Sequence, residues 1–168
     1  MTCRYRYAGP AEIAGRVVGF GGFLVDSVEK LRDSLRSMDG YQSEGSLTVT
    51  FIVGLGGELR VSDRRSEHVK CAGGQPVLSA GEMTFVCEND RIFVERVTNQ
   101  STGYCPEPES WRSVVDALER IPLGHPDSFD PAFVFRKCPS CSQINIIKDQ
   151  WYICDVCQTS LPIEWNFG

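Results

Sequence analysis

The sequence predicts an α+β fold, a small and mostly antiparallel sheet with two helices, followed by a C-terminal zinc ribbon. Apolar residues recur at helical spacing in two segments, and they alternate in strand-like runs that form two hairpins. Four cysteines near the C-terminal end follow the pattern C-x2-C-x12-C-x2-C. We therefore expect an α+β domain over residues 1–135 and a cysteine module over residues 136–168.

Composition and charge narrow the class of protein. The chain has 168 residues, of which 42% are hydrophobic and 23% charged, as in folded globular proteins and unlike disordered ones. Its net charge of −5 argues against a general nucleic-acid binder, because such proteins need excess Lys and Arg to neutralise phosphates. The longest apolar stretch, Val17–Val25, is interrupted by glycines and is too short to cross a membrane. We expect a cytoplasmic protein with no membrane contact, since no signal-peptide cleavage pattern follows Arg4 and Arg6.

Two segments have the periodicity of amphipathic helices. The first covers residues 26–38, with Asp26 or Ser27 placed to cap its free amide groups. The second starts at Pro108, a residue that suits the first turn of a helix. Its apolar residues form a stripe that can pack on a sheet: Trp111, Val114, Val115, Leu118 and Ile121.

The middle of the chain is rich in predicted strands. Alternating runs and turn residues predict two hairpins, 47–53 with 58–62 and 83–87 with 92–97. Glycines at 54, 56 and 57 form the first turn, and residues 88–90 form the second. A last short strand is expected at residues 132–135. The domain is therefore predicted to be a sheet with helices packed on it.

The cysteine module has the ligand spacing of a zinc ribbon. Each C-x2-C pair can present two thiolates to one metal ion, and Zn²⁺ favours four such ligands in a tetrahedron. The predicted ligands are Cys138, Cys141, Cys154 and Cys157, with short strands at 144–147 and 151–153 around a turn. With four protein ligands no position is open for water, so one structural Zn²⁺ per chain is expected. A redox dithiol or a pair of disulfides is the alternative.

The surroundings of the predicted zinc site favour a protein partner. The basic residues Arg136, Lys137 and Lys148 are balanced by Asp149, Asp155 and Glu164. The tail Trp165-Asn166-Phe167 can either fold back over the module or dock on a partner.

A second candidate site lies in the segment 68–106. His68, Glu82, Ser101 and Tyr104 could surround a small ligand, with His68 as a general base, Glu82 as an acid or a ligand for a hydroxyl, and Tyr104 as a hydrogen-bond donor. Glycines at 73, 74 and 81 leave room beside the backbone. Two further hypotheses are a nucleophilic Cys71 or Cys105, and a second metal site from His68, Cys71, Cys87 and Cys105. The alternative is that all these residues belong to the scaffold.

Two resemblances accompany these motifs. The run of His68, Ala72-Gly73-Gly74, Ala80-Gly81 and Ser101 to Pro106 resembles a segment of plant IQ-motif calmodulin-binding proteins and of various bacterial proteins, although Gly103 stands where that pattern has His. The whole chain is similar to small uncharacterised bacterial proteins that end in a zinc ribbon and a Leu-Pro-x-x-Trp-Asn-Phe tail, matched here by residues 161–167. Neither resemblance implies an activity.

Two functions are compatible with these observations. The first is a zinc-binding protein that acts as a non-enzymatic binding or adaptor module through protein contacts. The second is a small enzyme that acts on a nucleotide-like or ADP-ribose-like ligand, or on a modified protein side chain, near His68, Glu82 and Tyr104. The sequence specifies neither the partner nor the oligomeric state.

Overall fold

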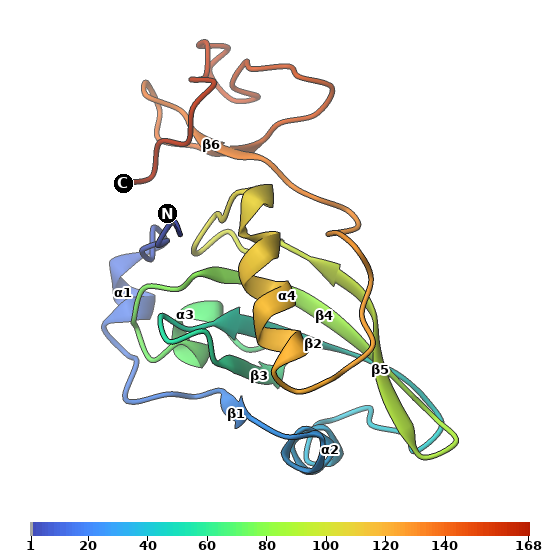
Figure 1. Ribbon diagram of the computed structural model, residues 1–168. Coiled ribbons are helices and arrows are strands. Elements are labelled where there is room, and N and C mark those ends of the chain that lie inside the picture. Colours follow the sequence, from blue (N-terminus) through green and yellow to red (C-terminus); the bar gives the residue numbers. More distant parts are fainter. Residues whose placement is uncertain (1) are drawn as a thin grey trace.

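The computed structural model describes residues 2–168 and has the α+β architecture predicted from the sequence (Figure 1). The helices are α1 (Ala11–Ala14), α2 (Val28–Arg36), α3 (His68–Cys71) and α4 (Trp111–Glu119), the last preceded by a 3₁₀ turn, Pro108–Ser110. The strands are β1 (Phe23–Val25), β2 (Gly45–Val53), β3 (Leu59–Asp63), β4 (Ser79–Glu88), β5 (Arg91–Thr98), β6 (Phe135–Lys137) and β7 (Ile144–Ile146). No helix within residues 2–168 combines the length and the apolarity needed to span a bilayer.

A five-stranded antiparallel sheet forms the centre of the domain. Its strand order is β1-β3-β2-β4-β5, and the longest pairing joins β2 to β4 from Gly45↔Cys87 to Val53↔Ser79. β6 and β7 form a separate two-stranded sheet in the cysteine module. The central strand β2 is therefore enclosed by neighbours on both edges, as expected for its apolar sequence.

The sheet is covered on both faces. α2 and α4 contribute to the larger core on one face, where Phe51 and Val53 pack with Leu118. α3 contributes to the core on the other face, where Ile52 packs with Val69 and Tyr104. Consecutive residues of β2 therefore enter opposite cores, because side chains alternate across a strand. In Figure 1 α4 lies across the sheet, and the cysteine module lies beyond one end of the domain.

The predicted helices and hairpins are confirmed in detail. Ser27 caps α2, since its hydroxyl accepts a hydrogen bond from the Lys30 amide at 3.2 Å. The turn between β4 and β5 places Asn89 and Asp90 at φ 50° and 62°. Both are residue types that tolerate the left-handed conformation that a two-residue hairpin turn requires.

Two predicted strands differ from the structure. The segment 132–135 does not join the main sheet, because the outer edge of β5 is taken by the loop after α4, whose Asp130 amide donates to the Val97 carbonyl. Strand formation starts instead at Phe135, in β6, which pairs with β7. The predicted strand at 151–153 is reduced to one bridge, Ile153 with Ser160.

Candidate metal centre and predicted ligand site

The four predicted cysteine ligands converge on one point. Their sulfur atoms all lie within 4.8 Å of one another. The sulfur atoms of Cys138 and Cys157 lie 3.5 Å apart, and those of Cys141 and Cys154 lie 3.6 Å apart. A tetrahedron with metal–sulfur bonds of about 2.3 Å has edges of about 3.8 Å, so this cluster has the size of a four-thiolate metal site.

Each C-x2-C pair is shaped by its own backbone. In the first turn the Cys138 amide donates to the Gln143 carbonyl at 2.8 Å, and the Ser142 amide donates to the Cys138 carbonyl at 2.9 Å. Ser142 has φ 65°, which closes the turn through the left-handed region. The Cys141 amide points at the Cys138 sulfur, 3.5 Å away.

The second turn repeats the first with an offset of 16 residues. The Cys154 amide donates to the Thr159 carbonyl at 2.8 Å, and the Gln158 amide donates to the Cys154 carbonyl at 3.0 Å. Gln158 has φ 63°, like Ser142. The two turns are therefore equivalent metal knuckles, each aiming backbone N–H groups at sulfur.

Polar groups around the cluster favour ionised sulfur at Cys154 and Cys157. The backbone of Gln143 lowers the pKa of Cys141, but burial and the three neighbouring sulfurs outweigh it and raise that pKa to about 12. The amides of Cys157 and Val156, together with the Asn145 side chain, lower the pKa of Cys154. The hydroxyl and amide of Thr159 lower the pKa of Cys157 to about 6. Thiolates bind metals and thiols do not, so these donors prepare the cluster for a cation.

The donor set has no vacant position. Four thiolates complete the tetrahedral shell that Zn²⁺ and other soft divalent ions adopt. Cys138 and Cys154 are buried, whereas Cys141 and Cys157 face solvent. Such a site can hold a metal ion that organises the chain, and it presents no open coordination position to a substrate.

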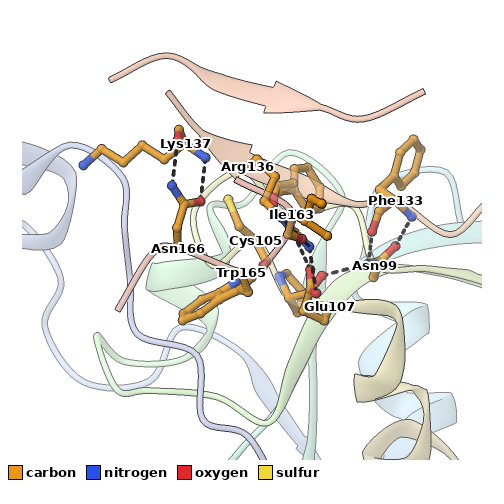
Figure 2. A network of polar contacts seen from close by, with 11 residues as sticks. Asn99, Cys105, Glu107, Phe133, Arg136, Lys137, Ile163, Trp165 and Asn166 are labelled. Atoms are coloured by element: carbon orange, nitrogen blue, oxygen red, sulfur yellow. Dashed lines mark hydrogen bonds and ion pairs between the residues drawn. The ribbon is translucent and has the colours of Figure 1, made fainter. Parts of the chain in front are cut away.

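An ion pair joins the cysteine module to the domain (Figure 2). Arg136 of β6 donates through Nη1 to the Glu107 carboxylate at 2.8 Å, and its side chain is only 5% exposed. The same guanidinium donates to the Ile163 carbonyl at 2.6 Å and to the Phe135 carbonyl. One buried side chain therefore connects the domain, β6 and the C-terminal tail.

Two asparagine side chains hold the strand that enters the module. Asn99 donates to the Phe133 carbonyl at 2.8 Å and accepts from the Phe133 amide at 2.7 Å. Asn166 forms the same pair of hydrogen bonds with Lys137, at 2.7 Å and 2.9 Å (Figure 2). In each pair the side-chain amide replaces the backbone of a neighbouring strand.

The aromatic tail folds back on the domain. The indole N–H of Trp165 donates to the Cys105 carbonyl at 2.8 Å, and its ring packs edge-on against Tyr5 with centroids 5.5 Å apart. The sequence predicts a tail that folds back over the cysteine module or docks on a partner, whereas in the structure Trp165 packs on the domain and Asn166 binds Lys137. Sequence reasoning missed the roles of Arg136, Glu107, Asn99 and Asn166, because no local pattern specifies contacts between segments about 30 residues apart.

All four residues of the predicted ligand site have partners within the chain. His68 hydrogen bonds through Nε2 to the Gly81 carbonyl at 2.9 Å, and the neighbouring Glu82 pairs with Arg64 at 3.1 Å. Burial lowers the pKa of His68, while the bond to Gly81 and the nearby Glu82 act in the opposite direction. His68 and Glu82 therefore lie close together on α3 and β4.

The other two residues of this predicted site are buried, and Tyr104 packs in the core on the side of the sheet that α3 covers. The Tyr104 hydroxyl donates to the Gln75 carbonyl at 2.8 Å, and the Ser101 hydroxyl accepts from the Tyr104 amide at 3.2 Å. Five surface hollows of 280 to 400 Å³ are lined by other residues than these four. Partners within the chain thus satisfy the four side chains, and their role in binding a ligand stays a prediction.

The remaining cysteines lie apart from the cluster. Within residues 2–168, Cys71, Cys87 and Cys105 join no group of metal-ligating side chains, so the hypothesis of a second metal site with His68 finds no support. Burial raises the pKa of Cys71 to about 11 and that of Cys105 to about 12. Neither thiol has the low pKa of a nucleophile at neutral pH.

Comparisons with known proteins identify no relative. No protein-family model, no curated protein and no solved structure matches the chain.

Proposed function

We propose that this protein is a non-enzymatic binding module whose cysteine module is held by one structural Zn²⁺ and contacts other proteins. The closed cluster of four thiolates carries the proposal, because it supplies what a structural zinc ion needs and leaves no position for water. A segment this small, with a core of Cys138, Cys154 and Leu161, gains much of its folding free energy from the metal.

The surface of the cysteine module supports a protein partner. Trp151 is 66% exposed, Val156 64% and Ile163 74%, although all three are large apolar residues. Exposed aromatic and aliphatic side chains of this kind are typical of protein interfaces. The nearby charges are mixed in sign, which does not suit a phosphate backbone.

Elemental analysis tests the metal assignment. Protein purified under reducing conditions should contain about one zinc per chain. Cys154→Ser should lose the zinc, while the matched variant Cys3→Ser, which changes an exposed thiol outside the cluster, should retain it. A chain that contains iron, or that stays fully folded over residues 136–168 without any metal, would contradict the assignment.

Site-specific crosslinking tests the protein partner. A photoreactive amino acid at position 151 should crosslink to one or a few defined proteins, and Trp151→Ala should weaken the isolated complex at least tenfold. The same probe at Phe93, which is 36% exposed on β5, is the control. Equal crosslinking from both positions, or tight binding of duplex DNA or single-stranded RNA at moderate salt, would argue against this function.

A further inference from the structure

The C-terminal tail, residues 161–167, is attached at both of its ends. At one end Leu161 packs in the core of the cysteine module, and its amide donates to the Tyr152 carbonyl at 2.8 Å. At the other end Trp165 contacts Tyr5 and Cys105 of the domain. The tail therefore bridges the metal cluster and the domain.

The position of this tail depends on the metal ligands. Leu161 lies in one small core with the ligand residues Cys138 and Cys154. Asn166 is bound to the backbone of Lys137, which directly precedes Cys138. Loss of the metal would loosen both supports at once, because a core of this size does not hold without its ion.

The thiolates that hold the metal are open to oxidants. Cys141 and Cys157 are exposed, and each has a partner sulfur on the opposite knuckle at 3.6 Å or 3.5 Å. The two sulfur atoms of such a pair need to move about 1.5 Å closer to reach the length of a disulfide bond. Disulfides across the two knuckles can therefore form between Cys138 and Cys157 and between Cys141 and Cys154.

We infer that the metal cluster and the tail form a redox-sensitive latch, an inference that rests on the zinc assignment proposed above. In the reduced, metal-bound state the tail lies on the domain. A hydroperoxide oxidises two thiolates to one disulfide, taking up two electrons and two protons, and hydrogen peroxide leaves as two molecules of water. Two such steps convert the four thiolates into two disulfides and release the metal as a hydrated dication.

Release of the latch changes the surface of the protein. Tyr5, which is 3% exposed in the latched state, loses its contact with Trp165. The rings of Trp165 and Phe167, whose centroids are 5.6 Å apart in the latched state, become free to bind elsewhere. Arg136 loses the Ile163 carbonyl, so the ion pair with Glu107 opens to water. An oxidised molecule thus presents apolar groups that a reduced one covers.

The test follows zinc and tail in the same sample. In the full chain with Cys3→Ser, Trp111→Phe and Trp151→Phe, Trp165 is the remaining tryptophan and reports the position of the tail. About two equivalents of hydrogen peroxide should release zinc to a chromogenic chelator and shift the Trp165 emission to longer wavelength in parallel. Reductant with added zinc should reverse both signals, and mass spectrometry should find the two cross-knuckle disulfides.

A control variant separates the latch from the metal site. Asn166→Ala removes the two hydrogen bonds to Lys137 and no ligand, so it should keep its zinc and show the shifted Trp165 emission before any oxidant is added. Zinc release with unchanged Trp165 emission and unchanged amide exchange over residues 161–168 would overturn the latch. Absence of zinc from the untreated protein would instead overturn the proposed function on which the latch rests.

Discussion

Arg136 and Glu107 face each other across the junction between the cysteine module and the domain, 2.8 Å apart and with little access to water. The two residues are 29 positions apart in the chain, and the guanidinium also binds two backbone carbonyls. A charge in such a place is stabilised only while its partner is present.

Removal of one member of this pair should destabilise the protein. Arg136→Met leaves the Glu107 carboxylate and the Ile163 carbonyl without a donor, and should lower the free energy of unfolding by about 3 kcal/mol. Urea denaturation of the zinc-loaded protein measures this change. Asp26→Asn, which breaks an exposed ion pair with Lys30, is the control and should cost less than about 0.5 kcal/mol. Equal effects of the two variants would show that the junction contributes little.

Gly81 should not tolerate a side chain. A Cβ atom at this position would lie 1.9 Å from the Thr98 carbonyl oxygen, because β4 and β5 approach closely there. Gly81→Ala should therefore cost about 3 kcal/mol or prevent folding. Gly124→Ala, whose Cβ would meet its nearest atom at 3.7 Å, should be tolerated. Thermal unfolding followed by circular dichroism compares the two variants, and similar melting temperatures would contradict this geometry.

Stability should fall in mildly acidic solution because of His68. Burial lowers the pKa of this side chain in the folded state below its usual value near 6.5, so the unfolded chain binds more protons below that pH. The free energy of unfolding should therefore decrease as the pH falls below about 6.5, and should be largest above it. His68→Gln keeps a donor for the Gly81 carbonyl and should flatten this part of the pH profile. If the free energy of unfolding of the variant depended on pH as steeply as that of the original protein, the loss of stability in acid would come from groups other than His68.

Tyr104→Phe should affect stability and leave the surface unchanged. The hydroxyl donates to the Gln75 carbonyl in a buried position, so its loss should cost about 1 kcal/mol. Amide exchange near residue 75 should increase in the variant. A variant of normal stability that loses binding of a small ligand would instead support the site predicted from His68, Glu82, Ser101 and Tyr104.

Elements defined by local patterns were predicted well. α2 and α4 follow from their apolar periodicity and caps, and the hairpins β2–β3 and β4–β5 follow from alternation and turn residues. The metal cluster follows from the spacing of its cysteines, which the structure brings within 4.8 Å. In these cases the information lies within about 20 consecutive residues.

Elements defined by distant contacts were not predicted. β1 has three residues and exists because β3 offers it an edge. The strand expected at 132–135 does not join the sheet, because the loop after α4 occupies the edge of β5 and the Asn99 side chain, 34 positions away, pairs with Phe133. The partners of the predicted ligand-site residues also depend on packing, since Tyr104 enters a core with α3, the helix that carries His68. A sequence pattern indicates which types of contact a residue can make. Which distant residue it contacts is decided only when the chain folds.

The contact between Tyr5 and Trp165 has a consequence for how the chain folds while it is being synthesised. These residues are separated by almost the whole sequence, yet their rings touch and both ends of the chain lie side by side (Figure 1). During translation the N-terminal segment emerges first and can pair with Val77, but Tyr5 lacks its contact with Trp165 until residue 165 has left the ribosome. The domain is thus complete only after the cysteine module has been synthesised, so the nascent protein exposes the surface that the tail later covers.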